Sequence, residues 1–402
     1  MVTTNPALTF ITILSWLLAV AWLVHAIFVV RGMSTLPDVT GNAARDSFTK
    51  DDGQITVIVP ARDEEASIQN TLRSLLASTG VRLQIIAVND RSTDATGQRM
   101  DFVAAEAEAA GGVHTLTVLH ITELPGGWLG KPHAMAIAAR QARSPWLLFT
   151  DGDVIFHPRA LEIALREAEA RHANHLVLVP TVILKNATET AMLATMNMIS
   201  QGMVRLWKVS DPRARDFIGV GGFNLICRDV YEQLGGFEAL RMEVLDDLRL
   251  GWMVKRAGYR QCIIVGRDLV RLRWLHGAFS VICLAEKNGF AAYHYRVALT
   301  LLASLGLFTL AVLPLIAIAE GGWPLVAGLV AYIAVALTFW GNRKITPAPP
   351  WLAVLYAPAT LVVLFALLRS MTLALARQGI DWRGTRYALN ELRRNSKRSW
   401  RF

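Results

Sequence analysis

Long apolar stretches near both ends of the sequence constrain this chain more than any other feature. Residues 8–30 form a 23-residue stretch in which His25 is the only ionisable residue, and three more stretches follow at 297–319, 323–340 and 351–368. As a helix, a stretch of this length can cross about 30 Å of hydrocarbon. We therefore expect a membrane protein, and the hydrophobic fraction of 53% agrees with this.

The charges that flank these stretches predict the orientation of the chain. Residues 1–7 contain no Lys or Arg, so we interpret residues 8–30 as a retained anchor and not as a signal peptide. Arg31, Arg45 and Lys50 follow the anchor, which places the next domain in the cytoplasm, at a bacterial-type inner (plasma) membrane. Three further crossings would leave the C-terminal segment outside, so one of them, such as the one that contains Pro358, is expected to be re-entrant or interfacial. The sequence leaves this point open.

Most of the positive charge lies in one segment. The net charge is +9, and residues 369–402 contain nine Lys and Arg residues against Asp381 and Glu391. A basic segment after a membrane span favours binding to an anionic membrane surface, whereas nucleic acid would need a basic face on the folded domain. The three cysteines are widely spaced in apolar surroundings and fit neither a zinc site nor a disulfide framework, which indicates a reducing compartment.

The middle of the chain alternates between short apolar runs and amphipathic helices. Strands are expected at 55–59, 83–88, 116–119, 146–150 and 176–179, with helical periodicity between them, which predicts an α/β domain with a parallel sheet. The segment 187–209 breaks this alternation and is rich in Met. It could lie in the headgroup plane, line a groove for an apolar substrate, or be an ordinary core helix.

Acidic residues follow several of the predicted strands. The run LLFTDGD at 147–153 ends in Asp151 and Asp153, Asp63 and Asp90 follow earlier strands, and Asp246 and Asp247 start a helix. Carboxyl ends of parallel strands share one edge of a sheet, where ligands bind. Carboxylates gathered there repel one another unless a cation or a ligand separates them, so we expect a site that holds a divalent metal and substrate phosphates.

These motifs together resemble the inverting family 2 glycosyltransferases of the GT-A fold. The resemblance covers about residues 55–265 and consists of VIVPARDEE at 57–65, VNDRSTDAT at 88–96, Gly130-Lys131, the TDGD stretch, a glycine loop with Phe223-Asn224, and LDDLRLGWMVKRAGYR at 245–260. With the apolar stretches, the chain is most similar to the ceramide glucosyltransferase-like and hopanoid-associated enzymes that act on lipids. The resemblance implies an α/β, Rossmann-like GT-A (nucleotide-diphospho-sugar transferase) domain with transmembrane helices at both ends.

The resemblance also implies roles for individual residues. The nucleotide-sugar, usually a UDP-sugar, would bind Asp90, Asp151 and Lys131, and Asp153 would hold Mn²⁺ or Mg²⁺ on the diphosphate. Asp247 would be the general base that activates an acceptor hydroxyl, although Asp246, which replaces the usual Glu, leaves open which carboxylate acts. Further donor contacts are expected from Pro60, Ala61, Asp63 and Gly222.

One departure from the family pattern concerns the acceptor. Arg273 and Trp274 lie in V-R-L-R-W, where Val270 replaces the Gln or Arg of processive members and of many lipid-specific relatives. We therefore predict a non-processive enzyme, with Arg273 and Trp274 as weaker acceptor-site candidates. The expected divisions are an anchor at 1–31, a linker at 32–53, the GT-A domain at 54–270, an interfacial amphipathic segment at 271–296, transmembrane segments at 297–368 and a basic tail at 369–402.

Three functions are compatible with these sequence features. The first is transfer of one sugar to the hydroxyl of a membrane lipid. The second is transfer to polyprenyl phosphate, an acceptor that is already an anion and needs no base. The third, from a different class, is a membrane transport or scaffold protein whose α/β domain only binds nucleotide; the absence of a G-x-x-x-x-G-K-[ST] phosphate loop disfavours it.

Overall fold

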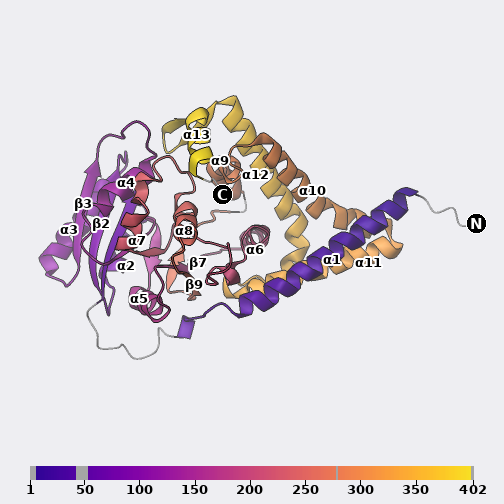
Figure 1. Cartoon of the computed structure of the whole chain (residues 1–402), viewed down its shortest axis with the longest axis horizontal. Coiled ribbons are helices and arrows are strands. Elements are labelled where there is room, and N and C mark those ends of the chain that lie inside the picture. Colours follow the sequence, from indigo (N-terminus) through magenta and orange to yellow (C-terminus); the bar gives the residue numbers. More distant parts are fainter. Residues whose placement is uncertain (1–5, 42–52, 278, 400–402) are drawn as a thin grey trace, which may run out of the picture.

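The computed structural model describes residues 6–41, 53–277 and 279–399, and it places an α/β part beside a group of long apolar helices (Figure 1). The α/β part contains a seven-stranded sheet in the order β3-β2-β1-β4-β8-β6-β9. The strands are β1 (Gln54–Ala61), β2 (Arg82–Asp90), β3 (Thr115–Ile121), β4 (Trp146–Phe149), β6 (His175–Val179), β8 (Asn224–Cys227) and β9 (Gln261–Val265).

The sheet is parallel except at β8, which runs antiparallel to both β4 and β6. The five strands expected from the sequence are parallel to one another, which confirms the prediction, and β8 is an additional, antiparallel strand that was not predicted. The physical reason is that the glycine loop before β8 lies at the carboxyl edge of the sheet, so β8 enters from that edge and must run in the opposite direction. Both the loop and the ends of the parallel strands consequently face one site.

Helices cover both faces of the sheet. One face carries α2 (Ile68–Leu76), α3 (Thr96–Ala110) and α5 (Ala160–Ala170), and the other carries α4 (Gly130–Ala139), α7 (Arg228–Gln233) and α8 (Asp246–Arg256). In α2, the residues Ile68, Leu72 and Leu75 recur at helical spacing and are completely buried. Burial of one such side chain stabilises the fold by about 1.5–3 kcal/mol, so the two faces together fix the sheet rigidly.

A small second sheet adjoins the edge where the acidic residues lie. It consists of β5 (Val154–Phe156), β10 (Val270–Leu272) and β7 (Thr181–Val182), with β5 antiparallel and β7 parallel to β10. Because β4 ends at Phe149 and β5 starts at Val154, Asp151 and Asp153 occupy the short connection between the two sheets. This connection fixes both carboxylates at the sheet edge.

Four helices of the described residues are long and apolar enough to cross a membrane: α1 (Pro6–Ser34), α10 (Val297–Glu320), α11 (Gly322–Gly341) and α12 (Tyr356–Ala376). Helix α1 packs along α11 through small residues such as Ala19, Ala26, Ala331 and Ala334. Small side chains allow the close approach that holds helices together in lipid. Large apolar side chains such as Phe28 are exposed on the outside of this group.

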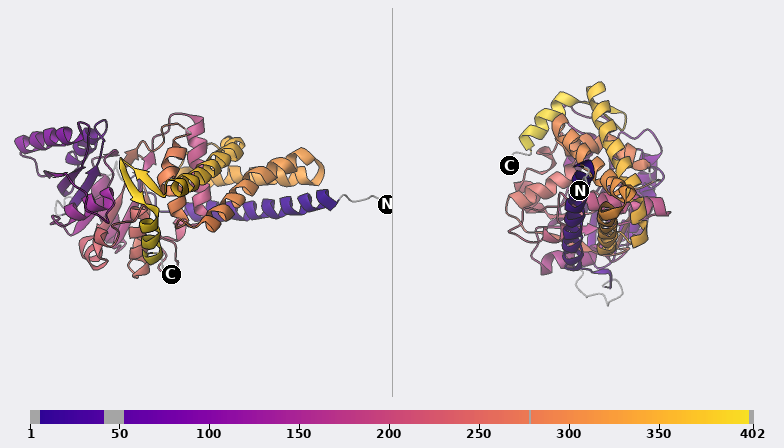
Figure 2. Two further views of the ribbon diagram at one scale, coloured as in Figure 1. Left: turned by 90° about the horizontal axis from the view of Figure 1, so that it is seen from above. Right: turned by 90° about the vertical axis from the view of Figure 1, so that its right-hand side faces the viewer.

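Helix α12 takes a different course from the other three. In Figures 1 and 2, α1, α10 and α11 extend away from the α/β part, whereas α12 crosses them steeply and stays beside it. It packs against α6 (Ala187–Gln201) and α9 (Ser280–Ala292). The chain then returns to the α/β part through the hairpin β11 (Gly379–Trp382) and β12 (Thr385–Ala388), followed by α13 (Leu389–Ser399).

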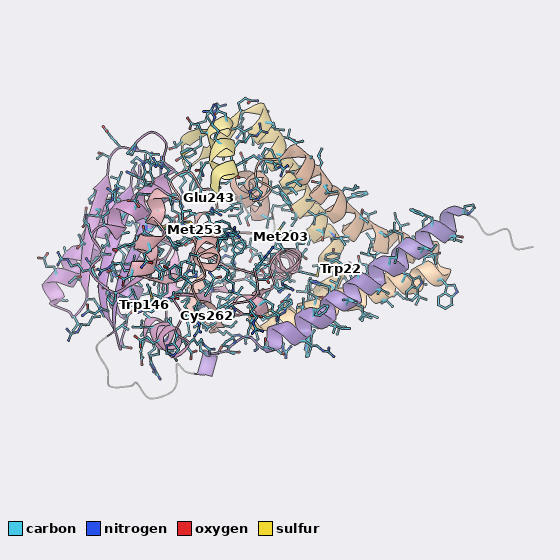
Figure 3. All side chains as sticks on the ribbon, in the orientation of Figure 1. Trp22, Trp146, Met203, Glu243, Met253 and Cys262 are labelled. Atoms are coloured by element: carbon cyan, nitrogen blue, oxygen red, sulfur yellow. The ribbon has the colours of Figure 1, made fainter. Side chains whose placement is uncertain are left out.

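The Met-rich segment forms the boundary between the two parts. Helix α6 ends at Gln201, before Gly202, and a short 3-10 turn at Leu206–Lys208 follows, so the helix is shorter than the 187–209 segment. Trp22 of α1 belongs to the same buried apolar cluster as Ala194 and Met198 of α6, whereas Met203 is exposed beyond the end of α6 (Figure 3). One face of α6 is therefore fixed to the membrane helices.

Candidate active site

A cavity of about 750 Å³ lies at the carboxyl edge of the main sheet. Its walls come from the ends of β1 and β4, the start of α4 and α8, the glycine loop, α6, α9 and the C-terminal hairpin. The residues predicted for the site that line it are Pro60, Ala61, Asp90, Lys131, Asp151, Asp153, Gly222, Asp246, Asp247 and Trp274. Segments nearly two hundred positions apart in the sequence thus converge on one cavity, as expected from strand ends that share an edge.

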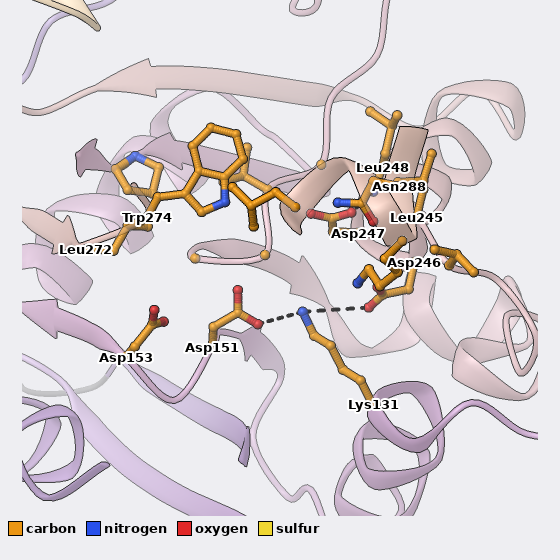
Figure 4. A pocket seen from close by; sticks show the side chains of 18 of the residues that line it. Lys131, Asp151, Asp153, Leu245, Asp246, Asp247, Leu248, Leu272, Trp274 and Asn288 are labelled. Carbon is orange, nitrogen blue, oxygen red and sulfur yellow. Dashed lines mark hydrogen bonds and ion pairs between the residues drawn. The ribbon is translucent and has the colours of Figure 1, made fainter. Parts of the chain in front are cut away.

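Lys131 and Asp151 form the central ion pair of the cavity. The Nζ of Lys131, in the first turn of α4, donates a hydrogen bond of 2.6 Å to Oδ1 of Asp151 (Figure 4). Burial alone would raise the pKa of Asp151, but the Lys131 ammonium outweighs this and holds that pKa below its usual value. Gly221 packs so closely that a Cβ there would lie 2.6 Å from Oδ2 of Asp151. The glycine loop can therefore touch the carboxylate only because it has no side chain.

Asp153 forms no ion pair with any Lys, Arg or His side chain in the part of the chain that the structure describes. Burial, and then the negative charges of Asp151 and Glu64, raise the pKa of Asp153 to about 6. No group of three potential metal-ligating side chains occurs within the ranges that the structure describes. Magnesium-type sites, however, commonly use one or two carboxylates, with substrate phosphates and water as the other ligands. Asp153, with Asp151 beside it, fits a metal held jointly with a diphosphate.

Asp246 and Asp247 start α8 and point in different directions. Asp246 is 3% exposed, and its Oδ2 lies 4.0 Å from Nζ of Lys131. Burial raises the pKa of Asp246 to about 6, with Lys131 opposing this and Asp247 adding to it. Asp247 is turned toward the side of the cavity where Trp274 and Asn288 lie (Figure 4). Its carboxylate accepts a hydrogen bond of 2.7 Å from the amide of Leu248 in the first turn of α8.

The end of the cavity at β1 and β2 holds Asp90, which is buried and pairs with its neighbour Arg91 at 2.8 Å. A Cβ on Gly130 would lie 2.4 Å from Oδ2 of Asp90, so this position also needs glycine. Asp63 does not line the cavity. It has a positive φ of 54°, and its carboxylate accepts hydrogen bonds from the amide and hydroxyl of Thr93. Asp63 therefore links the loop after β1 to the loop after β2 by hydrogen bonds.

The two acceptor-site candidates separate in the structure. Trp274 lines the cavity, but Arg273 does not. The guanidinium of Arg273 makes a bidentate pair with Glu189 of α6, at 2.7 and 2.8 Å, and also donates to the carbonyl of Ile183. Glu189 is buried and also accepts hydrogen bonds from the amides of Lys185 and Gly277. Arg273 thus fixes the segment that carries Trp274 to α6.

The C-terminal hairpin supplies cavity residues that were not predicted from the sequence. Trp382, Arg383 and Tyr387 line the cavity, and Tyr387 accepts a hydrogen bond from the amide of Gly130. Arg383 donates to the carbonyl of Arg62 at 2.7 Å and to Glu64 at 2.6 Å. The basic segment 369–402 is therefore partly folded against the α/β part. The sequence did contain a local signal for this hairpin, because Arg383-Gly384 lies between two short β-rich runs. In the structure these two residues form a two-residue turn, and both have a positive φ.

Comparisons with known proteins agree with this arrangement. A sequence model of the glycosyltransferase-like family 2 matches residues 53–271. The mannosyltransferase PcManGT of Pyrobaculum calidifontis, solved in complex with GDP-Man and Mn²⁺, has a TM-score of 0.51 and 18% identity and covers 92% of this chain and 99% of its own. That similarity shows the fold, which is of the GT-A type.

Curated relatives lead to the same class of enzyme. A 4,4'-diaponeurosporenoate glycosyltransferase of Staphylococcus aureus is 24% identical over 198 residues, which are 49% of this chain and 50% of the relative. The chain thus spans about half the length of the curated relatives it matches. The fold is of the GT-A type, and four helices of the described residues are long and apolar enough to cross a membrane. The chain belongs to glycosyltransferase family 2.

Proposed function

We propose that this enzyme moves one sugar, with inversion, from a UDP-sugar to the hydroxyl of a membrane lipid, and that it is non-processive. The proposal rests on the lining of the cavity, which is charged on one side and apolar on the other. One side holds the carboxylates and Lys131, and the other is apolar and reaches Ile345, just after the membrane helix α11. A polar donor and an apolar acceptor can therefore meet in one cavity.

The donor fits the polar side of the cavity. Asp90 and the end of β1 at Pro60 and Ala61 lie at the end suited to the base, and Lys131 and Asp151 lie nearer the centre. Asp153 would hold a Mn²⁺ or Mg²⁺ ion, which supplies Lewis-acid stabilisation of the diphosphate when it is bound. The structural neighbour from Pyrobaculum calidifontis was solved with a nucleotide-sugar and Mn²⁺, which supports this assignment.

Asp247 would act as the general base in this reaction. It takes the proton of the acceptor hydroxyl while the oxygen attacks the anomeric carbon, and the bond between that carbon and the β-phosphate oxygen breaks on the opposite face. The products are the glycosylated lipid and the nucleoside diphosphate. Asp246 faces Lys131 on the donor side, so of the two carboxylates Asp247 is the one that faces the acceptor (Figure 4).

The apolar side of the cavity fits a lipid acceptor. It is lined by Leu193, Met203 and Val204 in and after α6, by Leu284 of α9, and by Trp274. The curated relatives, named for diaponeurosporenoate, support a lipid-related substrate. Transfer to polyprenyl phosphate is the runner-up, but two carboxylates at the reacting end repel a phosphate, which favours a neutral hydroxyl.

Incubation of the purified protein in detergent with labelled nucleotide-sugars and host lipid extract tests the proposed function. We expect one UDP-sugar to label one lipid class, identified by mass spectrometry, and chelator to prevent the labelling. The proposal is abandoned if nucleotide-sugars bind but no lipid is labelled under any condition. Labelling that appears only in polyprenyl phosphate would establish the runner-up instead.

Arg383→Ala tests the contribution of the hairpin to the donor site. Arg383 lines the cavity and lowers the pKa of Asp151 by its charge, although Lys131 contributes more. We expect the KM for the nucleotide-sugar to rise about tenfold, because a charge-assisted contact beside the diphosphate is lost. Arg394→Ala, at an exposed position of α13, is the matched control and should leave this KM unchanged. If both variants instead weaken membrane binding equally and neither changes this KM, the C-terminal segment contributes only positive charge for binding to the membrane surface.

We also propose that the α/β part and the hairpin face the cytoplasm. The hairpin contacts Gly130 and Glu64, so it lies on the same side as the α/β part. This is consistent with three crossings by α1, α10 and α11, and with α12 as the helix that does not cross. Green fluorescent protein fused after residue 402 should therefore fluoresce, and alkaline phosphatase at the same place should be inactive. The reverse pattern would contradict this topology.

A further inference from the structure

A buried glutamine holds the glycine loop by both backbone groups of one residue. Gln261 of β9 is 1% exposed, and its Oε1 accepts a hydrogen bond of 3.0 Å from the amide of Ile218. Its Nε2 donates one of 2.9 Å to the carbonyl of the same residue and one of 3.2 Å to the carbonyl of Gly251 in α8. One side-chain amide therefore joins β9, the start of the glycine loop at 218–222 and the helix that carries Asp247.

The chemistry of its partners fixes the orientation of the Gln261 amide. Ile218 offers an N–H and a carbonyl, so a reversed amide would bring two donors together and two acceptors together. Nε2 of Gln261 also lies 2.7 Å from Nδ1 of His175, and since this Nε2 can only donate, Nδ1 accepts. The proton of His175 is therefore on its own Nε2, which donates to Oδ1 of Asn224 at 2.7 Å. Burial lowers the pKa of His175 to about 4, although the hydrogen bond to Asn224 opposes this, so the ring is neutral at pH 7.

The glycine loop touches both reacting sides of the cavity. A Cβ on Gly219 would collide with the backbone carbonyl of Asp247, and a Cβ on Gly251, one helical turn later, would collide with the loop as well. The start of α8 therefore rests directly on the loop. Gly221 of the same loop packs against Asp151, which belongs to the donor side of the cavity. The loop thus sets the distance between the proposed base and the donor.

We propose that Gln261 is a positioning residue that acts through Asp247: it holds the glycine loop against α8, so that the base carboxylate stays at a fixed distance from the donor. This rests on the proposed function, because it assumes a hydroxyl acceptor and Asp247 as the base. Gln261 does not line the cavity, so its effect reaches the reaction only through the loop and α8. A misplacement of about 1 Å can lower the rate of such a reaction about a hundredfold.

Gln261→Met in the full-length protein, assayed with Mg²⁺, tests the proposal. Methionine fills a similar volume but forms no hydrogen bond with the loop, so we expect kcat to fall about tenfold or more. The KM for the nucleotide-sugar should stay close to that of wild type, because the hydroxyl of Thr150 still donates to the carbonyl of Gly222 at 2.9 Å and holds the donor end of the loop. If Gln261→Met fails to fold, Gln261→Glu, which keeps the shape and the acceptor for the amide of Ile218, takes its place.

The matched control is Gln84→Met. Gln84 of β2 also holds a loop by both groups of its amide, which accepts from the amide of Arg143 at 2.9 Å and donates to the carbonyl of Gln141 at 3.0 Å. None of these three residues lines the cavity. The control should therefore lose stability in a similar way but keep its kcat.

A double-mutant cycle with Asp247→Asn separates a positioning role from a merely structural one. Gln261→Met should lower kcat in the wild-type background and cause little further loss in the Asp247→Asn background, where no base remains to be positioned. A residue that only supports the fold would lower kcat by the same factor in both backgrounds. Melting temperatures of all the proteins in the cycle identify any variant that is partly unfolded at the assay temperature.

Three outcomes overturn the proposal. Equal losses of kcat in both backgrounds show that Gln261 acts independently of Asp247. An unchanged kcat in Gln261→Met shows that the loop keeps its position without this amide. An equal loss of kcat in Gln84→Met shows a general effect of loosening a loop. A wild-type protein that transfers sugar to no lipid, or an Asp247→Asn variant with full activity, would contradict the proposed function itself, which separates that failure from these three.

Discussion

Asp247→Asn should lower kcat for transfer to a lipid hydroxyl about a hundredfold or more, with little change in the binding of the nucleotide-sugar. The amide keeps the size of the carboxylate but cannot take a proton, and general base catalysis contributes a factor of about 10² to 10⁴. The side chain points to the acceptor side of the cavity, away from the ion pair of Lys131 and Asp151 (Figure 4). The measurement is the initial rate of labelled lipid formation at saturating donor.

Two comparisons make this result specific. Asp229→Asn changes an exposed acidic residue in the first turn of another helix, α7, and should leave the rate unchanged. Transfer to polyprenyl phosphate should fall much less in Asp247→Asn, because a phosphate is already deprotonated. A variant that retains most of its hydroxyl-transfer activity would exclude Asp247 as the base and direct attention to Asp246.

Asp153→Ala should lower transfer by about two orders of magnitude and weaken the dependence on Mn²⁺ or Mg²⁺. The carboxylate is half-buried beside the negative charges of Asp151 and Glu64 and pairs with no cation in the described residues, which is an environment that suits a metal ligand. Each loss of about 1.4 kcal/mol of transition-state stabilisation costs a factor of ten, and a metal supplies several kcal/mol. Metal titrations of the initial rate measure the effect.

Measurements of nucleotide binding distinguish the loss of a metal ligand at position 153 from simple misfolding of the variant. Nucleotide diphosphate should bind wild type more tightly with Mn²⁺ than without it, and Asp153→Ala should lose this difference while its melting temperature stays close to that of wild type. Full metal-dependent activity in Asp153→Ala would show that the diphosphate and other residues hold the ion. In that case Asp151 would be the next residue to test.

Much of the polar side of the cavity could be predicted from local patterns. Asp90, Asp151 and Asp153 lie two to four positions after the last apolar residues of their strands, and the parallel order of β2, β1 and β4 brings these ends together. Gly222 and Lys131, which the sequence motifs also indicated, line the same cavity. These residues are positioned by the sheet itself, so strand ends and turn residues carry enough information.

The positions of the other charged residues at and near the site depend on contacts between residues that lie far apart in the sequence. Arg273 looks like an acceptor-site residue from its motif, but Glu189 on another helix takes its guanidinium. Asp63 follows a strand as Asp151 does, yet its positive φ turns it toward Thr93. The hairpin residue Arg383 reaches Glu64, more than three hundred positions earlier. No periodicity or spacing encodes which distant partner a charged side chain will meet.

The return of the hairpin to the cavity has a consequence for biosynthesis. A ribosome releases the α/β part first, and that part can fold around its sheet while the later helices are still being made. The cavity nevertheless lacks Trp382, Arg383 and Tyr387 until α10, α11 and α12 have been synthesised and the hairpin has folded back. The complete lining of the cavity therefore forms late, after the three long apolar helices that precede the hairpin.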